Sequence, residues 1–276
     1  MKVDPDSFYA VLSAAVRDLT EFGFDSVERV EGWIRRIRDA ARAAMVPEWI
    51  LDDRLKETFR TAYRRSVERG GLLRHHPGVS RYTLDRVAPR LRLELDRRIA
   101  ASANLIKLNR EAAIESTLRR FAGWSTSIPL GGTDAADRTG VKTEIRKSMA
   151  SLPFQERRVL IDQAHKFAAN LSDIVSKDAG AIAAVWNSHW LQVGYDYRED
   201  HKERDGVVFV VRGNRALDAG LMRLDGHACT DEITTPGEEV YCRCWYTYVY
   251  SLRDLPPGMV TERGREDLAR LRATTA

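Results

Sequence analysis

Two cysteines separated by one residue, Cys242 and Cys244, are the side chains of this chain best suited to chemistry. In an extended segment, residues i and i+2 point to the same face, so both sulfurs would be presented together. The third cysteine, Cys229, and a histidine, His201, lie upstream. Three cysteines and one histidine are typical of closed structural zinc sites. The sequence therefore predicts a structural zinc site formed by His201, Cys229, Cys242 and Cys244.

The sequence does not decide which residue is the fourth ligand. His227, two residues before Cys229, could take its place as the ligand. Alternatively, the cysteines could be small buried apolar residues, or two of them could be linked. A metal in a module of about seventy residues would act by stabilising a small core rather than by catalysis.

A catalytic site is the less favoured interpretation of the same region. Asp196, Asp200 and Asp205 surround His201 in sequence, and a histidine beside carboxylates can act as a general base. However, charged loops and Asp-Gly turns are common at protein surfaces. No glycine-rich phosphate loop, His-Glu-x-x-His or Gly-x-Ser-x-Gly motif occurs. The sequence does not predict an enzyme, and the alternative is a metal-dependent hydrolase, such as a nuclease or toxin-like protein, that uses the His201 loop.

The elements that must position these residues change character along the chain. Apolar residues recur at helical spacing from a start at Asp4-Pro5 to about Ser176, with a long helix over 89–123 and a shorter helix around 181–190. Beyond Trp190, strands are predicted over 207–211 and 239–251, with a hairpin turn over 212–215 between them. The pattern indicates an α+β fold, with an extended, mainly helical N-terminal body followed by a small β-rich C-terminal module, stabilised by zinc.

Four segments follow from these patterns. Residues 1–125 form a helical body with one long helix, and 126–190 hold a linker and further helices, predicted over 141–150 and 153–176. Residues 191–254 form the small β-rich module, and 255–276 form a charged tail with a short helix.

Composition excludes several classes of protein. Hydrophobic residues make up 43% and charged residues 30% of the 276 residues, as in ordinary soluble proteins. No apolar stretch is long enough for a membrane span, and the first residues lack the apolar core of a signal peptide. An odd number of cysteines argues against a secreted disulfide scaffold. We expect a protein that works in a cytoplasm or in a particle assembled there.

The charge pattern is mildly basic. The net charge of +4 is small for a dedicated nucleic-acid binder. Arginine pairs recur on the predicted helices and form either solvated faces or a surface for phosphate groups or an acidic partner. These pairs are Arg35-Arg36, Arg64-Arg65, Arg97-Arg98 and Arg119-Arg120. Three further histidines, at 75, 76 and 165, are predicted to lie in a loop and on a helix surface.

The order of residues from Trp186 to Cys244 resembles the C-terminal domain of phage head-morphogenesis proteins, the Mu F-like minor head proteins. The shared features are Trp186, Asp196-Tyr197-Arg198, His201, Asp205-Gly206, Pro236-Gly237-Glu238-Glu239-Val240 and Cys242-Arg243-Cys244. The resemblance covers about residues 180–250. Some members carry Cys-x-x-Cys where this chain has Arg198–His201, which places His201 at a sulfur-ligand position. The chain departs from the pattern at Tyr241, where Asn is usual, and in the insert 221–235, which holds Cys229.

The resemblance implies a minor capsid protein of a tailed bacteriophage. Such a protein docks at the portal vertex of the virion head and acts structurally in head assembly or in genome packaging and ejection. Its implied partners are the portal protein, and beyond it the major capsid protein or packaged DNA, with several copies around a symmetric ring. It would occupy the host cytoplasm during assembly. We expect the portal contact on the helical region or on the aromatic strand that carries Trp245, Tyr246, Tyr248 and Tyr250.

Overall fold

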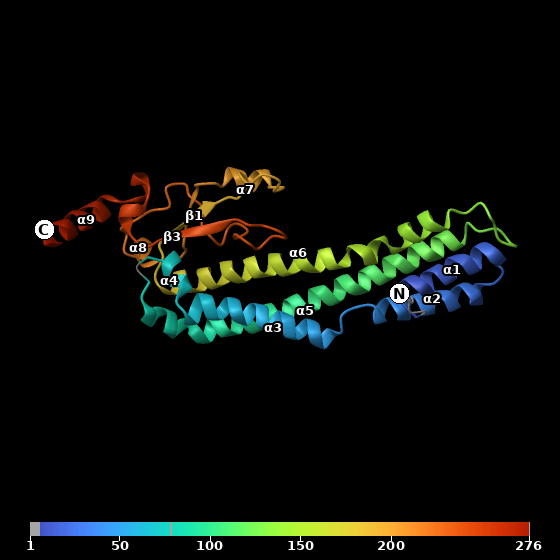
Figure 1. Cartoon of the computed structure of the whole chain (residues 1–276). Coiled ribbons are helices and arrows are strands. Elements are labelled where there is room, and N and C mark those ends of the chain that lie inside the picture. The colour runs from blue at the N-terminus through green and yellow to red at the C-terminus, as the bar shows by residue number, and fades with distance from the viewer. Residues whose placement is uncertain (1–5, 78, 276) are drawn as a thin grey trace. The chain divides into compact units, whose positions relative to one another are not determined.

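The computed structural model describes residues 6–77 and 79–275 and has the predicted α+β fold (Figure 1). The start predicted at Asp4-Pro5 lies outside the described residues. The first helix, α1, spans Phe8–Phe22, and its N-cap Ser7 accepts a hydrogen bond from the backbone N–H of Ala10. None of the helices in the described ranges is long and apolar enough to cross a membrane.

The chain forms two compact units, and each unit combines segments that are distant in sequence. The first unit joins the chain up to Lys56 with Ala100–Leu160. The second joins Glu57–Ile99 with the chain from Ile161 onward. The second unit holds all three cysteines and the sheet.

The core of the first unit lies between α1 and α2 (Val27–Ala43), with parts of two longer helices. Its buried side chains include Leu12, Leu19, Ile37, Ile114 and Phe121. The α1–α2 turn packs against the loop after α5 through glycines. A Cβ on Gly23 would stand 2.5 Å from the backbone nitrogen of Gly131, and Gly23 has a φ of +84°. Only glycine therefore fits this close approach.

Two helices run through prolines. α5 spans Arg81–Ser125 and begins before Pro89, where the sequence predicted the start. α6 spans Arg138–Asp178 as one helix and continues through Pro153, where two helices were predicted. A proline inside a helix removes one hydrogen bond and costs about 3 kcal/mol. Buried side chains on both sides offset this loss: Leu84 and Leu91 around Pro89, and Leu152 and Val159 around Pro153.

A π-helix continues α3 (Glu48–Tyr63) in the second unit. It spans Arg64–Glu68 and is followed by the short α4 (Gly71–His75). The buried residues Leu55, Phe59, Tyr63 and Val67 recur every four residues. In an α-helix of 3.6 residues per turn such a stripe drifts around the axis, and the wider π turn brings Val67 back to the buried side.

The sheet has three antiparallel strands in the order β2-β1-β3. They are β1 (Ala183–Asn187), β2 (Val208–Val210) and β3 (Trp245–Val249). The helix predicted over 181–190 is wrong, because this segment is the central strand. Its apolar run is buried on both faces, a pattern that a short buried helix shares. The two predicted strands both exist in shorter form, and each pairs with β1 rather than with the other.

The segment predicted as a hairpin turn starts a helix instead. The Asn214 side chain accepts hydrogen bonds from the backbone N–H groups of Ala216 and Leu217, which caps α8 (Arg215–Asp218). The remaining elements are α7 (Glu199–Glu203), the 3-10 turns η2 (Leu252–Asp254) and η3 (Pro257–Met259), and α9 (Glu262–Thr275). α9 is the helix expected in the charged tail.

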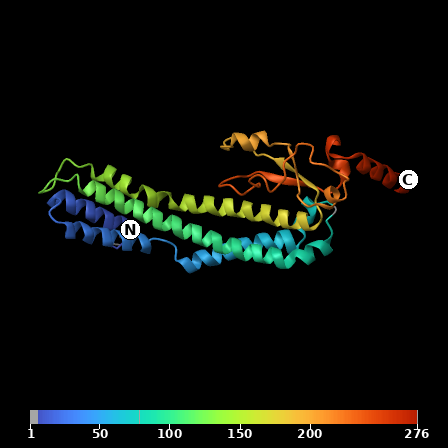
Figure 2. The same ribbon diagram turned by 180° about the vertical axis from the view of Figure 1, so that it is seen from behind.

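The two faces of the sheet bury different side chains. One face, which we call the polar face, carries Ala184, Trp186, Phe209, Tyr246 and Tyr248. It lies beside the C-terminal half of α6 in both views (Figures 1 and 2), and the Tyr248 hydroxyl donates to Asp173 of α6 at 3.0 Å. The other, which we call the apolar face, carries Ala183, Val208, Val210 and Val249.

Candidate metal centre

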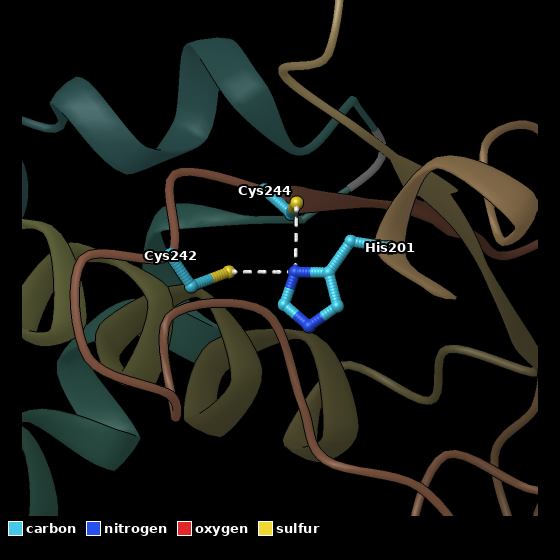
Figure 3. A group of neighbouring side chains, drawn as sticks. All are labelled: His201, Cys242 and Cys244. Atoms are coloured by element: carbon cyan, nitrogen blue, oxygen red, sulfur yellow. Dashed lines mark hydrogen bonds between the residues drawn. The ribbon is translucent and has the colours of Figure 1, made fainter. Parts of the chain in front are cut away.

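His201, Cys242 and Cys244 meet in a buried cluster beside the polar face (Figure 3). The Sγ atoms of both cysteines lie 3.6 Å from Nδ1 of His201. All three residues are at most 2% exposed. The predicted convergence of two sulfurs and one imidazole is therefore present, and the cluster is a possible metal-binding site.

A turn, rather than a strand, presents the two sulfurs. β3 begins only at Trp245, and Tyr241 has a φ of +61°, which interrupts extended pairing before Cys242. The Gly237 N–H donates to Cys242 Sγ at 3.4 Å. Gly237 has a φ of +81°, and a Cβ there would stand 3.2 Å from Cβ of Ala169. The glycine of the Pro-Gly dipeptide thus allows the backbone to wrap the thiol.

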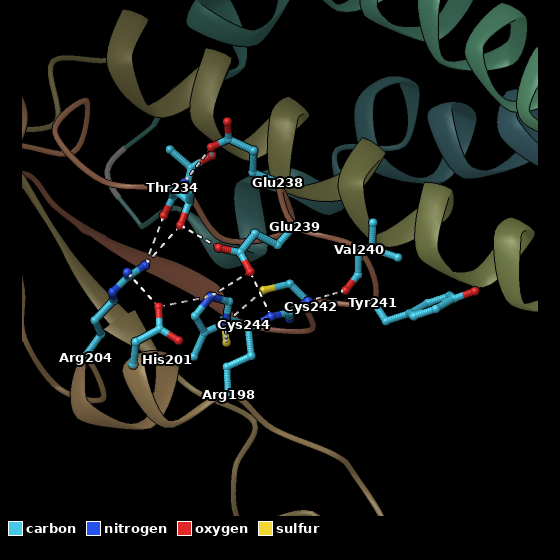
Figure 4. Close-up of polar contacts among 12 residues, drawn as sticks. Arg198, His201, Arg204, Thr234, Glu238, Glu239, Val240, Tyr241, Cys242 and Cys244 are labelled. Carbon is cyan, nitrogen blue, oxygen red and sulfur yellow. Dashed lines mark hydrogen bonds and ion pairs between the residues drawn. The ribbon is translucent and has the colours of Figure 1, made fainter.

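Carboxylates stand behind the His201 ring (Figure 4). Nε2 of His201 lies 3.6 Å from Glu239 Oε2 and 3.9 Å from Asp200 Oδ2, and it has no closer hydrogen-bond partner among the described residues. Because the carboxylates face Nε2, they favour the tautomer with the proton on that nitrogen, which leaves the Nδ1 lone pair facing the sulfurs. This is the arrangement that a metal-binding histidine needs.

Two arginines hold these carboxylates in place (Figure 4). Arg198 pairs with Glu239 at 2.8 Å and donates to the carbonyl of Val240 at 3.0 Å. Arg204 pairs with Asp200 at 2.8 Å. The charge of each carboxylate is therefore already compensated, so a metal ion gains more on the sulfur side of the ring than on this side.

The two thiols of the cluster ionise differently. The pKa of Cys244 is lowered, first because Cys242 donates a hydrogen bond to its sulfur, and the Ser188 hydroxyl lowers it further. The pKa of Cys242 is raised by that same hydrogen bond and by burial. Thiolates are the form that binds metals. Cys244 is therefore the more readily ionised of the two sulfurs, and a bound cation would displace the proton of Cys242.

Trp186 forms the floor of the cluster. Its ring makes edge contacts with His201 at 5.2 Å and Tyr246 at 5.6 Å between centroids. The Asp205-Gly206 turn fixes the strand end that carries it, because the Gly206 N–H donates to the carbonyl of Trp186 at 2.8 Å. Asp205 accepts hydrogen bonds from the Ser188 N–H at 2.7 Å and the Trp190 indole at 3.0 Å. These two hydrogen bonds hold the loop after β1.

The structure does not bring Cys229 to this cluster. Cys229 bridges to Val210 of β2 and belongs to the apolar cluster on the other face of the sheet. Burial raises the pKa of its thiol. His227, the alternative fourth ligand, donates from Nδ1 to the carbonyl of Val208 at 2.9 Å instead. Among the described residues, the centre therefore offers three ligand atoms.

Two residues of α6 contact the loop that carries the cysteines, and the sequence did not predict either contact. His165, predicted on a helix surface, contacts the Cys244 carbonyl through Nε2 at 3.0 Å. Asp162 accepts a hydrogen bond from the Tyr241 N–H at 2.6 Å. The two residues are three positions apart on one helix, a spacing that indicates a shared face. That spacing was the available signal, but nothing in the sequence says what the face meets.

The tyrosines of β3 are not free for a partner. Tyr248 is buried against α6, and the Tyr246 hydroxyl is buried beside Trp186. Of the four aromatic residues that the sequence suggested for a portal contact, Trp245 is the most exposed, at 45%. The alternating pattern of β3 predicts a face that carries Tyr246 and Tyr248, and in the folded chain this face is buried against α6 and Trp186.

Fold and site together define an α+β protein with a buried Cys-Cys-His centre at one end of its sheet. Comparisons with protein-family models, with curated proteins and with solved structures found no match. The likeness to phage head proteins therefore depends on the residue pattern alone.

Proposed function

We propose that His201, Cys242 and Cys244 bind a zinc ion. In a tetrahedral site, bonds of about 2.1 Å to nitrogen and about 2.3 Å to sulfur separate the two ligand atoms by about 3.6 Å. Octahedral angles would bring them to about 3.1 Å. The observed Nδ1–Sγ distances of 3.6 Å fit the tetrahedron. Thiolate and imidazole ligands also suit zinc better than they suit calcium or magnesium.

The proposed role of the zinc ion is structural. Its ligands come from α7 and from the turn before β3, which are separated by about forty residues in sequence. The elements between them are short: β2 has three residues and α8 has four. A metal that joins such segments contributes directly to folding. The burial of all three ligand side chains supports this role.

On this basis we propose that the chain is a structural minor capsid protein of a tailed-phage head, acting at the portal vertex. The single observation that carries this proposal is that the residues of the head-protein pattern belong to one connected structure. Trp186, Gly206 and Gly237 each contact or fix the centre, as described above. A chance match of scattered residues would not be expected to converge on one site.

The test of the assembly role uses the full chain and the portal protein of the same phage genome. Co-expressed, the two are expected to co-purify with several copies of this chain per portal ring. Trp245→Ala is expected to weaken the complex if β3 is the contact, and Tyr248→Phe is the matched internal control. Failure of the wild-type chain to associate with portal rings or with assembled heads would overturn the assembly role, whatever the metal content.

A metal-dependent hydrolase is the second candidate, because a catalytic zinc ion has three protein ligands and an open position. The centre offers three ligands among the described residues. The zinc-loaded chain would then cleave a phosphodiester or peptide substrate that the metal-free chain leaves intact. Equal background rates for both forms would exclude this candidate.

A further inference from the structure

The charge of the chain is concentrated in one segment. Residues 57–99, the first segment of the second unit, contain eleven arginines, no lysine and five carboxylates. Their net charge of +6 exceeds the +4 of the whole chain, so the remaining residues are slightly acidic together. The small net charge of the whole chain therefore conceals a local excess of positive charge in this segment.

Six of these arginines already form ion pairs, with four carboxylates between them. The ion pairs are Arg64 with Glu57, Arg81 with Asp85, Arg86 and Arg90 with Asp178, and Arg97 and Arg98 with Glu94. In the Arg97-Arg98 pair, Arg98 is buried and both guanidinium groups share Glu94. The remaining arginines are the ones available to a partner.

Five arginines remain, and one of them, Arg92, lies over the Tyr63 ring at 6.0 Å. The other four are exposed and form what we call the unpaired arginine group: Arg60, Arg65, Arg69 and Arg74. None of them has a carboxylate partner within the part of the chain that the structure describes. Arg65 and Arg69 each follow a buried residue, Tyr63 or Val67, by two positions, which places them on the side of the helix away from the core. Arg74 follows across the Gly70–Gly71 turn, in α4.

The chemistry of this surface favours a phosphate backbone over a protein. Protein interfaces have an apolar centre with aromatic anchors and few charges there. Between Trp49 and Tyr82, no described residue is an exposed large hydrophobic side chain. A surface of arginines without an apolar anchor binds by charge alone, and the planar guanidinium matches phosphate oxygens in pairs.

We propose that the unpaired arginine group binds the phosphate backbone of a nucleic acid without sequence preference. Each arginine that contacts a phosphate releases a counterion, so the affinity falls steeply with salt. The four arginines lie within fifteen residues of sequence, in α3, in the π-helix, at its C-cap and in α4, and none of them is a metal ligand. Nucleic-acid binding by these arginines therefore does not require bound zinc or a role in the phage head.

The experiment measures binding of the full chain to a labelled DNA duplex of random sequence at several salt concentrations. The variant R60Q/R65Q/R69Q/R74Q removes the group, and R35Q/R119Q/R157Q/R263Q removes the same charge from exposed arginines elsewhere. The first variant is expected to bind at least tenfold more weakly. Its slope of log affinity against log salt should be shallower by up to about 3.6, or 0.9 per lost phosphate contact. The second variant should keep most of the wild-type slope.

Three results would overturn the proposal: equal losses in the two variants, wild-type binding that is insensitive to salt, or displacement of DNA by poly-glutamate at equal charge. The last result would identify an acidic protein as the partner. Circular dichroism and zinc content check that the variants are folded. If the fourfold variant does not fold, R60Q/R65Q and R69Q/R74Q are measured separately, and each should lower the slope by about half as much.

Discussion

The two faces of the small sheet both bury cysteine, in opposite surroundings. On the polar face, Cys242 and Cys244 meet a histidine whose far nitrogen is backed by carboxylates. On the apolar face, Cys229 lies among aliphatic side chains and contacts Val210 of β2. All three residues are about 1% exposed. Burial alone therefore does not distinguish a ligand from a small apolar residue, and the neighbours of the sulfur decide its role.

This difference predicts that the two faces of the sheet respond to different perturbations. The polar face is expected to respond to metal and to acid, because it buries two histidines, His201 and His76, beside hydrogen-bonding groups. The apolar face is expected to respond only to changes in packing. Four changes, from the largest expected effect to the smallest, test this division.

Removal of His201 should have the largest effect. His201→Ala takes away one of three ligands, and loss of a structural metal is expected to cost about 4 kcal/mol and to lower Tm by about 10 °C. Metal analysis and thermal unfolding measure both quantities. His227→Ala is the matched control, because its ring bonds to a carbonyl and not to the sulfurs. If the His201→Ala protein kept one zinc per chain and the wild-type Tm, His201 would not be a structural metal ligand, and the predicted difference between the two faces would be wrong.

Acid should destabilise the polar face through His76. Burial lowers the pKa of His76 to about 4, while its ordinary value is 6.5. The unfolded chain therefore binds this proton more readily, so stability is complete above about pH 6.5 and is lost as the pH falls toward 4. Between pH 7 and 5 this loss is about 2 kcal/mol.

The measurement for His76 is urea unfolding of the wild type and of His76→Gln at both pH values. The neutral glutamine can still hydrogen-bond to Ser176, the partner of His76 Nδ1 at 3.1 Å. Zinc release at acid pH affects both proteins, so the difference between them isolates His76. The same loss of stability in both proteins would show that His76 is not the acid-sensitive group.

Glu239→Gln should weaken the metal without unfolding the chain. Glu239 faces Nε2 of His201, and loss of such a partner typically costs 10–100-fold in metal affinity. Competition with a zinc-binding dye measures the change. Its neighbour supplies the control, because Glu238 accepts from the Thr235 N–H at 2.7 Å and has no contact with His201 among its hydrogen bonds. Equal affinities for both variants would mean that the carboxylate does not position the ring.

Cys229→Ala should have the smallest effect. Removal of one buried sulfur from the apolar cluster is expected to cost about 1 kcal/mol. Zinc content should stay at the wild-type value, as measured by metal analysis of the purified variant. Loss of zinc here would place Cys229 in the ligand set and would contradict the separation of the faces.

Part of the site could be predicted because it depends on short-range geometry. Cys242 and Cys244 share a side in any extended backbone, and that holds in a turn as well as in the predicted strand. The role of Cys229 could not be predicted, because it depends on the face of the sheet to which its loop returns. The segment 181–190 was misread for a similar reason: a strand buried on both faces has no alternation to reveal it.

The arginines show the same limit. Pairs such as Arg64-Arg65 and Arg97-Arg98 are alike in sequence, yet Arg97 and Arg98 both pair with Glu94, while Arg65 has no carboxylate partner among the described residues. A sequence gives the number of charges. Only the fold sets the distances that decide which of them are neutralised.

The sequence by itself determined the kinds of atoms available: two sulfurs one residue apart, a histidine upstream, and a glycine after Pro236 where the backbone needs a positive φ. These are local properties, set by the chemistry and conformational range of single residues. Tertiary structure decided which histidine meets the sulfurs, which cysteine stays apart and which strand lies in the centre. Those outcomes depend on contacts between residues that are distant in sequence. Strand pairing places β1 in the centre of the sheet, and packing on α6 determines which face of the sheet is covered by that helix.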